Sequence, residues 1–203
     1  MKKLDYWFQT NNLMTNNGKT VAMSYHTKQS RFPMRPKITY RNKDIAYKSD
    51  TKFLGIHITE NLKWTTHISI LRLELSKVCY ITKSVQAIMG LGMISFYHSK
   101  FESLVRYGII FCWAENESIP TFKLQKRVIR SMCGAGTSTS CSQLFKDCKI
   151  LTITSLYVLE VLCFLKKYKS TIQKNKQVHD HNTKTYMDLH IKPCNTNLYK
   201  KCN

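Results

Sequence analysis

The chain has 203 residues, 43% of them hydrophobic, and carries 32 Lys and Arg against 12 Asp and Glu, a formal net charge of +20. This apolar content excludes a globally disordered chain, because its burial offsets the loss of chain entropy. So large a positive excess disfavours a compact state unless a polyanion neutralises it, so nucleic acid is the leading expected partner and an anionic membrane surface the second.

No segment of the sequence has the pattern of a secretory leader or a membrane span. Met1-Lys2-Lys3 is followed by Leu4 and Asp5 instead of an apolar run. The most apolar stretch, residues 150–165, contains Glu160 and is shorter than the roughly 20 residues that span a bilayer. We therefore expect an intracellular protein, nuclear or cytoplasmic, with no membrane partner and with mostly reduced cysteines.

Short elements are predicted in the N-terminal third of the chain. Residues 4–14 place Leu, Trp and Phe at near-helical spacing and predict a helix. Residues 19–26 alternate apolar with small or polar side chains, which predicts a half-buried strand. Two short strands, 37–40 and 45–47, flank a polar turn, and residues 53–58 predict a further strand that contains a glycine.

The hydrophobic period then changes to that of a helix. Apolar residues recur at spacings of three and four at Ile68, Leu71, Leu75, Val78, Val85 and Met89. This predicts an amphipathic helix of roughly 23 residues, ended by Gly90 and Gly92. A free coiled coil is the alternative. A bundle helix is favoured, because further apolar residues widen the stripe: Ile70, Leu73, Ile81 and Ile88.

Four more helices and a tail follow. The helices are predicted over residues 94–111, 119–132, 142–148 and about 155–169, the last capped by Thr154 or Ser155. The last helix is apolar on nearly all sides, so we expect it at the centre of the bundle. After residue 170 the chain is polar and basic, which predicts an irregular tail. The sequence thus predicts an α+β fold, with a small antiparallel β region followed by a mainly α-helical bundle.

Two groups of basic residues are candidates for binding phosphates. On the third predicted bundle helix, Lys123, Lys126, Arg127 and Arg130 form a basic face without an acid within two turns. An ordinary solvated helix face is the alternative. A second group interleaves cations with aromatic residues, which suits single-stranded or hybrid nucleic acid. It comprises Lys28, Arg31, Arg35, Lys37, Arg41, Lys43 and Lys48, with Phe32, Tyr40 and Tyr47. Here the alternative is a basic loop with its aromatic residues packed inward.

The sequence predicts no independent active site or metal site. A polymerase needs paired carboxylates that hold two divalent metal ions, and the acids of this chain are isolated. No phosphate-binding glycine loop is present. Zinc-ligand types occur in the tail, but at irregular spacing: His179, His181, His190, Cys194 and Cys202. Cys133, Cys141 and Cys148 are no better arranged.

An ordered series of short motifs resembles the reverse transcriptases of non-LTR retrotransposons, of the jockey and LINE-like groups. The series is Trp7, Asn12-Leu13, Asn16 and Lys19-Thr20-Val21-Ala22-Met23; Lys52-Phe53-Leu54-Gly55-Ile56 followed by Leu62-Lys63-Trp64-Thr65-Thr66-His67-Ile68; Leu75-Ser76-Lys77-Val78-Cys79-Tyr80; Tyr107-Gly108-Ile109 with Trp113; Leu124-Gln125-Lys126-Arg127-Val128-Ile129-Arg130; Ile150-Leu151-Thr152 with Ser155-Leu156-Tyr157 and Glu160; and His181-Asn182-Thr183-Lys184. The resemblance covers essentially the whole chain, and the order of the motifs gives it its specificity.

The resemblance implies roles for particular residues. Lys52, Phe53, Leu54 and Gly55 would form the primer-grip turn that positions the primer 3′ end. Lys123, Lys126, Arg127 and Arg130 would hold template–primer phosphates of an RNA–DNA hybrid or another nucleic acid. Lys19 would stand where such polymerases place a proton donor for the leaving pyrophosphate, with a surface lysine at a strand start as the alternative.

The resemblance also divides the chain into three parts. Residues 1–62 correspond to the end of the palm with the primer-grip turn, residues 63–170 to a helical thumb-like bundle and residues 171–203 to a basic tail. The catalytic aspartates, and the Mg²⁺ that they hold, would belong to missing upstream polymerase domains. Ala114 departs from the family, where a glycine often follows the tryptophan. We therefore expect a template–primer-binding part that is inactive alone. A co-opted nucleic-acid-binding module and a decayed fragment without function are the alternatives.

Overall fold

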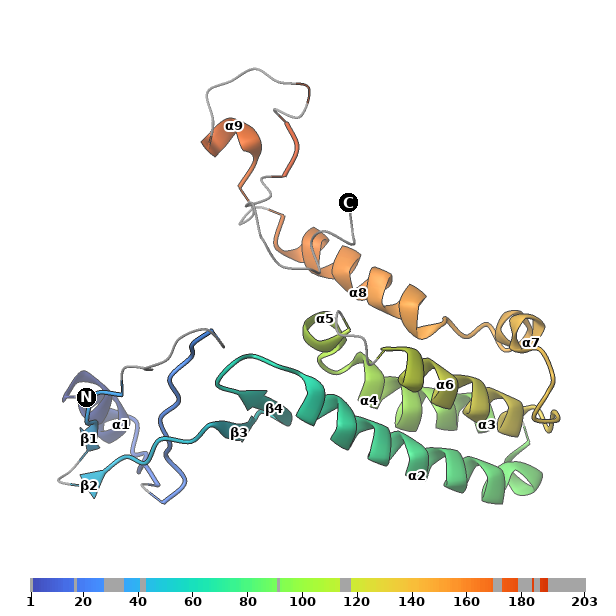
Figure 1. Ribbon diagram of the computed structural model, residues 1–203, viewed down its shortest axis with the longest axis horizontal. Helices are drawn as coiled ribbons and strands as arrows, with labels where there is room; N and C mark the ends of the chain where they lie inside the picture. The colour runs from blue at the N-terminus through green and yellow to red at the C-terminus, as the bar shows by residue number, and fades with distance from the viewer. Residues whose placement is uncertain are drawn as a thin grey trace. The chain divides into compact units, whose positions relative to one another are not determined.

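The computed structural model describes residues 2–16, 18–27, 35–40, 43–90, 92–113, 118–169, 173–178, 184 and 187–189. Its fold is α+β, as the sequence predicts, with two small antiparallel sheets followed by helices (Figure 1). The chain divides into two compact units, residues 1–70 and 71–203. The division falls within the first turns of the longest helix, so each unit is described by itself.

The described residues of the first unit form a helix, two pairs of antiparallel strands and the start of the longest helix. Its elements are α1 (Lys2–Thr10), β1 (Thr39–Tyr40), β2 (Lys43–Asp44), β3 (Asp50–Phe53) and β4 (Ile56–Thr59), with β1 paired to β2 and β3 to β4. The buried Tyr40 hydroxyl donates a 2.6 Å hydrogen bond to the Asp5 carboxylate, which fastens β1 to α1.

The strand expected over residues 19–26 does not form. Ala22 alone makes a bridge, parallel to Tyr47, through its N–H to Ala46 O at 2.9 Å and its carbonyl to Lys48 N at 3.0 Å. Side chains alternate in any extended segment, whereas a strand also needs a continuous ladder of partners. The alternation over 19–26 therefore indicated an extended backbone and not a sheet.

The second unit is mainly helical. Its first helix, α2, begins in the first unit and continues into the second. The helices are α2 (Thr65–Met89), α3 (Gly92–Phe96), the π-helix η1 (Tyr97–Glu102), α4 (Ser103–Arg106), α5 (Ile109–Cys112), α6 (Ser118–Met132), α7 (Cys141–Asp147), α8 (Ile153–Lys167) and α9 (Asn175–Val178). The helix expected over 94–111 is interrupted, because Tyr107 is extended and Gly108 takes a left-handed φ of 83°. That conformation suits glycine and stops a helix.

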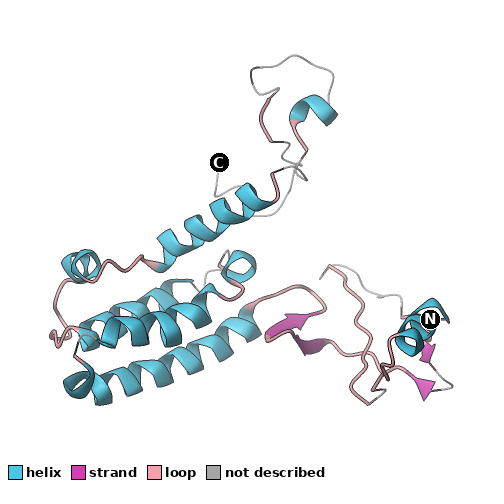
Figure 2. Cartoon of the chain, turned by 180° about the vertical axis from the view of Figure 1, so that it is seen from behind, coloured by secondary structure: helices cyan, strands magenta, loops and turns pink. Residues whose placement is uncertain are grey.

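The core lies between α2, the α3–α4 segment and α6, which run alongside one another (Figures 1 and 2). The predicted apolar stripe of α2 contributes Leu75 and Val78 to it, and the fully buried side chains Phe101 and Ile129 come from η1 and α6. Tyr97 stacks on Phe101 with ring centroids 5.3 Å apart. The bundle prediction for the long helix is therefore confirmed.

A buried glutamine joins three helical segments of this core. Gln125 on α6 is 0% exposed, and its Nε2 donates hydrogen bonds to the Tyr97 hydroxyl at 2.8 Å and to Leu151 O at 2.9 Å. Its Oε1 accepts a hydrogen bond of 3.0 Å from Ile153 N, the first residue of α8. Gln125 thereby satisfies two buried polar groups, the Tyr97 hydroxyl and Ile153 N, and the part-buried Leu151 O.

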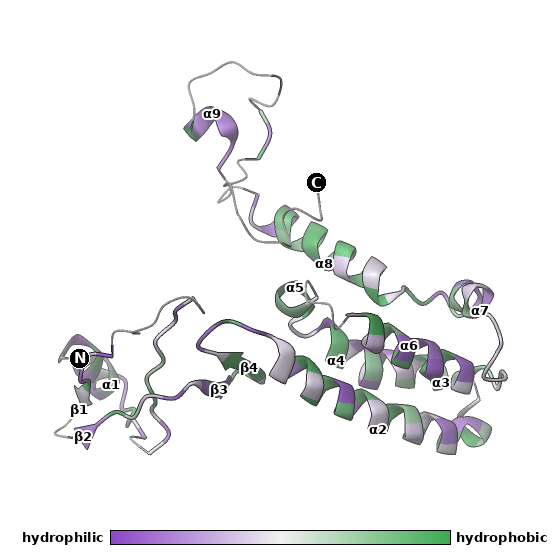
Figure 3. Ribbon diagram, in the orientation of Figure 1, coloured by the Kyte–Doolittle hydropathy of each residue, from purple (hydrophilic) through white to green (hydrophobic). Residues whose placement is uncertain are grey.

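Helix α8 packs on one side of the bundle and not at its centre, which corrects the prediction. Only Ile153 and Leu156 of this helix are fully buried. Further along, Arg106 pairs with Glu160 and Trp113 stacks on Tyr157, with ring centroids 6.3 Å apart. The second half is apolar in Figure 3 but largely exposed; Leu162, for instance, is 58% exposed. The apolar composition of a helix predicts that its side chains are buried, but it does not identify the elements that cover them.

The ends of α8 also differ in part from the sequence prediction. The cap is Thr152, whose Oγ1 accepts a 3.2 Å hydrogen bond from Ser155 N, and not Thr154 or Ser155. The expected irregular tail contains the short helix α9 and a bridge between Lys174 and Leu189. Most of residues 171–203 lie outside the described residues. Within the described ranges, no helix combines the length and apolarity needed to cross a bilayer.

Candidate nucleic-acid interface

Helix α6 has a buried apolar face and a basic face. Val128, Ile129 and Met132 are buried in the core, and their spacing sets the side of the helix that packs. The cations fall on the remaining surface, where Lys123 and Arg127 are exposed, one turn apart, and Lys126 and Arg130 are half-buried. The structure therefore brings together the four basic residues predicted from the sequence.

Two of these four cations are tethered by neighbouring groups. The Lys126 ammonium lies 4.4 Å from the centroid of the Phe122 ring, which itself stacks on Phe145 of α7. The Arg130 Nε donates a 2.8 Å hydrogen bond to Thr139 O in the loop after α6. Both contacts fix the side chain while keeping its positive charge.

Within the described residues, acidic side chains do not neutralise this basic face. Helix α6 contains no Asp or Glu, and residues 118–169 hold nine Lys and Arg against two Asp and Glu, an excess of seven. Of those two acids, Glu160 pairs with Arg106 and Asp147 accepts a hydrogen bond from Gln143. Among the residues that the structure describes, no carboxylate forms a salt bridge with Lys123, Lys126, Arg127 or Arg130.

The positive charge of Arg127 also reaches the edge of the core. The Cys79 thiol of α2 donates a 3.6 Å hydrogen bond to Leu124 O of α6. Burial raises the pKa of Cys79 to about 11, which outweighs the lowering effect of the Arg127 charge. Cys79 is therefore a neutral, packed thiol.

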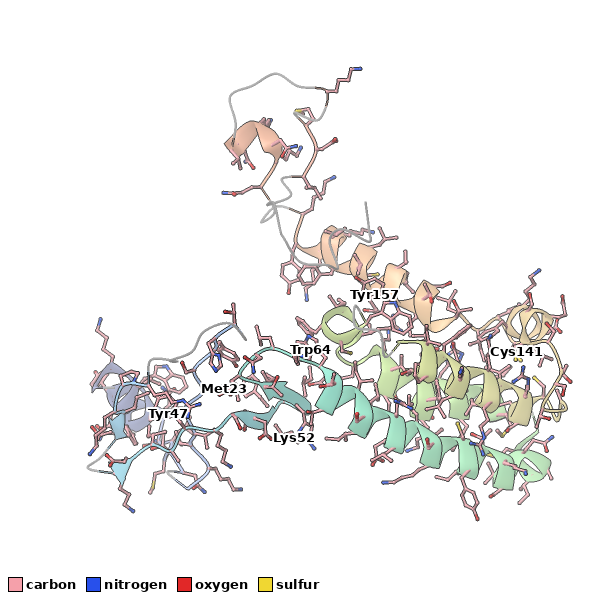
Figure 4. All side chains as sticks on the ribbon, viewed as in Figure 1. Met23, Tyr47, Lys52, Trp64, Cys141 and Tyr157 are labelled. Carbon is pink, nitrogen blue, oxygen red and sulfur yellow. The ribbon has the colours of Figure 1, made fainter. Side chains whose placement is uncertain are left out.

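The predicted primer-grip residues lie at the tip of a hairpin, which corrects the strand predicted over residues 53–58. Strands β3 and β4 pair antiparallel with Lys52 opposite His57 and Phe53 opposite Ile56, so the chain reverses at Leu54-Gly55. Both turn residues have positive φ, 47° and 85°. Two-residue hairpins favour this geometry because it matches the twist of the strands. Lys52, in the labelled side chains of Figure 4, projects from β3 next to this turn.

Leu54 occupies a conformation that costs a bulky L-residue about 1–2 kcal/mol. We expect Leu54→Asn to raise the free energy of unfolding of the first unit by about 1 kcal/mol, because asparagine tolerates left-handed φ. The same change should weaken nucleic-acid binding if the tip, where Leu54 is 74% exposed, contacts the bound strand. Urea denaturation and anisotropy titration of the same preparation measure the two effects.

The matched control for this substitution is Leu62→Asn. Leu62 also has a left-handed φ, 50°, and is 53% exposed, but it lies beyond β4 and outside the hairpin tip. It should gain similar stability without losing affinity. Equal losses of affinity in the two variants would show that the hairpin tip has no special role in binding.

The predicted proton donor Lys19 and the second basic group lie in the first unit. Lys19 is exposed but lies in a turn, where its N–H bonds to Asn16 O at 3.1 Å, and not at the start of a strand. In the second basic group, Arg35 pairs with Glu60 at 3.0 Å and Lys37 with Asp44 at 3.1 Å.

The two described aromatic members of that group, Tyr40 and Tyr47, make contacts within the first unit. Tyr40 is buried, and the Tyr47 hydroxyl donates a 2.7 Å hydrogen bond to Pro36 O. Lys28, Arg31, Phe32 and Arg41 lie outside the described residues. The packing of these two tyrosines agrees with the inward-packed alternative, while Lys43 and Lys48 of the same group are exposed.

Sequence reasoning missed His67 as a buried residue. It is 7% exposed, and neither ring nitrogen has a hydrogen-bond partner within the described part of the chain. Burial, and then the nearby His57, lower the pKa of His67 below its ordinary value, so its ring is neutral at pH 7. Its position three residues into α2, next to the apolar Ile68, was the available signal.

A search for metal-ligand groups and comparisons with known proteins give no further information on this interface. Over the described ranges, no three His, Cys, Asp or Glu side chains are grouped so as to hold a metal ion. The five tail residues named as zinc-ligand types lie outside those ranges. Comparison of the chain with protein-family models, with curated proteins and with solved structures found no match.

Proposed function

We propose that this chain binds the phosphate backbone of nucleic acid through the basic face of α6, as a template–primer-binding part of an RNA-directed DNA polymerase of the non-LTR retrotransposon type. The observation that carries the proposal is the set of four cations on one helix face without a carboxylate partner in the described part of the chain. The ordered motifs that resemble that family supply the polymerase context.

The physical basis is the release of counterions. Each phosphate that a lysine or arginine neutralises frees condensed cations, which makes association favourable at low salt. Lys123 and Arg127 stand one turn apart on the exposed side, while Lys126 and Arg130 are held in place by Phe122 and Thr139. This arrangement offers a row of charge to a strand without reading its sequence.

The proposed division of labour leaves the chemistry to other domains. By the resemblance, the paired carboxylates that hold Mg²⁺ belong to polymerase domains outside residues 1–203, which would be the protein partner of this chain. The hairpin tip at Leu54-Gly55 would then lie at the primer end, and the α6 face would hold the backbone. Binding without synthesis is the activity proposed for residues 1–203 alone.

A salt titration tests the proposal directly. The chain is titrated into a fluorescently labelled RNA–DNA hybrid at several salt concentrations, and anisotropy gives the affinity at each. Contact with about four phosphates should give a slope of log K against log salt of about −3 to −4. A complete lack of binding at low salt, or an affinity independent of salt, would overturn the proposal. Single-stranded RNA and duplex DNA serve as competitors and rank the strand types.

A further inference from the structure

Two cysteines at the junction of α6 and α7 lie in direct contact. Cys133 follows the last residue of α6, and Cys148 follows the last residue of α7. Their sulfur atoms are 3.5 Å apart, across 15 positions of sequence. Cys133 is exposed and Cys148 half-buried, so a small solute can reach the pair. The labelled Cys141 in Figure 4 marks this end of the bundle.

The backbone on both sides of the pair is already fixed by hydrogen bonds. Ala135 N donates to Arg130 O at 2.9 Å, which closes the end of α6, and Cys148 N donates to Leu144 O at 3.0 Å. The bond from Arg130 to Thr139 O braces the loop between them. These backbone hydrogen bonds hold the two thiols next to each other. Forming a disulfide then requires the two sulfur atoms to approach each other by only about 1.5 Å.

The neighbouring thiols lack this arrangement. Cys141 is buried, and its sulfur donates a 3.7 Å hydrogen bond to Lys126 O of α6. Cys79 is likewise buried and bonded to a backbone carbonyl, Leu124 O. Cys163 is exposed and lies in the second half of α8. Cys141 and Cys163 therefore serve as controls for a buried and an exposed thiol.

We propose that Cys133 and Cys148 form a reversible disulfide that closes the α6–α7 loop, with a low-molecular-weight disulfide of the glutathione class as the oxidant. One protein thiolate attacks a sulfur of the oxidant, forms a mixed disulfide and releases one small thiol. The second protein thiolate then attacks the protein sulfur of the mixed disulfide and releases the other small thiol. The protein loses two hydrogens, as protons and electrons, and the oxidant gains both.

The reaction is slow at neutral pH, because the thiolate is the attacking species. Partial burial of its sulfur, then the hydrogen bond with Cys148 and the charges of Cys148, Asp147 and Cys141, together raise the pKa of Cys133 to about 11. Oxidation through Cys133 therefore speeds up as pH rises toward 11, by about tenfold for each pH unit below that value. The pair is suited to slow, stabilising closure and not to rapid signalling.

The test uses the full chain equilibrated in buffers of increasing ratio of oxidised to reduced glutathione. Remaining thiols are trapped with N-ethylmaleimide, and the protein is digested with trypsin. Cleavage after Arg130, Lys146 and Lys149 gives the peptides 131–146 and 147–149. A disulfide-linked pair of these peptides, lost on reduction with dithiothreitol, is the expected product. Closing the loop should raise the thermal midpoint by about 5–10 °C.

Variants identify the cysteines, because peptide 131–146 also contains Cys141. Cys133→Ser and Cys148→Ser should each abolish the linked peptide and the redox dependence of the midpoint, whereas Cys141→Ser and Cys163→Ser should keep both. Circular dichroism confirms that each variant folds. Three results would overturn the proposal: a linked peptide that persists in Cys133→Ser, cross-links between chains only, or both thiols still labelled at the highest ratio.

Discussion

Replacing Gln125 by leucine is expected to lower the free energy of unfolding of the helical unit by about 3–5 kcal/mol. The leucine fits the apolar surroundings but leaves two buried groups, the Tyr97 hydroxyl and Ile153 N, and the part-buried Leu151 O without their hydrogen-bond partner. A buried polar group that loses its hydrogen bond costs about 1–3 kcal/mol. Urea denaturation followed by circular dichroism measures the change as a lower midpoint.

The matched control for this variant is Gln143→Leu. Gln143 is exposed on α7, where its Nε2 bonds to the Asp147 carboxylate at 2.8 Å, so its replacement should cost less than about 0.5 kcal/mol. Tyr97→Phe removes one partner of Gln125, and a double-mutant cycle isolates the coupling between the two side chains. Equal midpoints for Gln125→Leu and Gln143→Leu would mean that the buried network does not stabilise the bundle.

Neutralising both Lys123 and Arg127 to glutamine is expected to weaken nucleic-acid binding by about tenfold or more at low salt and to reduce the salt slope by about two. These two cations are exposed on α6 without a salt-bridge partner among the described residues, so their loss leaves the fold intact. Anisotropy titrations of the variant and the original chain at several salt concentrations measure both changes.

The control variant removes the same net charge elsewhere. Lys100 on η1 and Lys169 after α8 are exposed, and their double replacement by glutamine lowers the charge of the chain equally. If α6 is the binding surface, this variant keeps most of its affinity and slope. Equal losses in the two double variants would assign the binding to overall charge, and the α6 face would have no specific role.

The helical part of the fold was predictable because its residues repeat with a helical period. The apolar stripe of α2 contains one polar residue, Thr82. Thr82 can be buried there because its hydroxyl donates a 2.8 Å hydrogen bond to Val78 O of the same helix. The basic face of α6 was predictable for the same reason. The spacing of the apolar residues determines which face of α6 packs against the core, and the cations lie on the opposite, solvent-facing side.

The errors lie where a residue adopts a conformation that its type disfavours, or where the partner is distant in sequence. Leucine avoids left-handed φ, so nothing local indicated that the chain reverses at Leu54. The tethering of Arg130 depends on Thr139, nine positions away in a loop whose path the sequence does not specify. The contact between Cys133 and Cys148 has the same origin, since it depends on how α7 packs against α6.

The one-sided packing of α8 gives that helix two ends of unequal local stability. Its first turn is held by the Thr152 cap, and the bond from Ile153 to Gln125 and the buried Leu156 tie that turn to the bundle core. Beyond Glu160 the helix rests mainly on its own backbone hydrogen bonds, because Leu162 and Phe164 are exposed. This half can therefore unwind and re-form independently, as a low-energy local fluctuation that leaves the core closed.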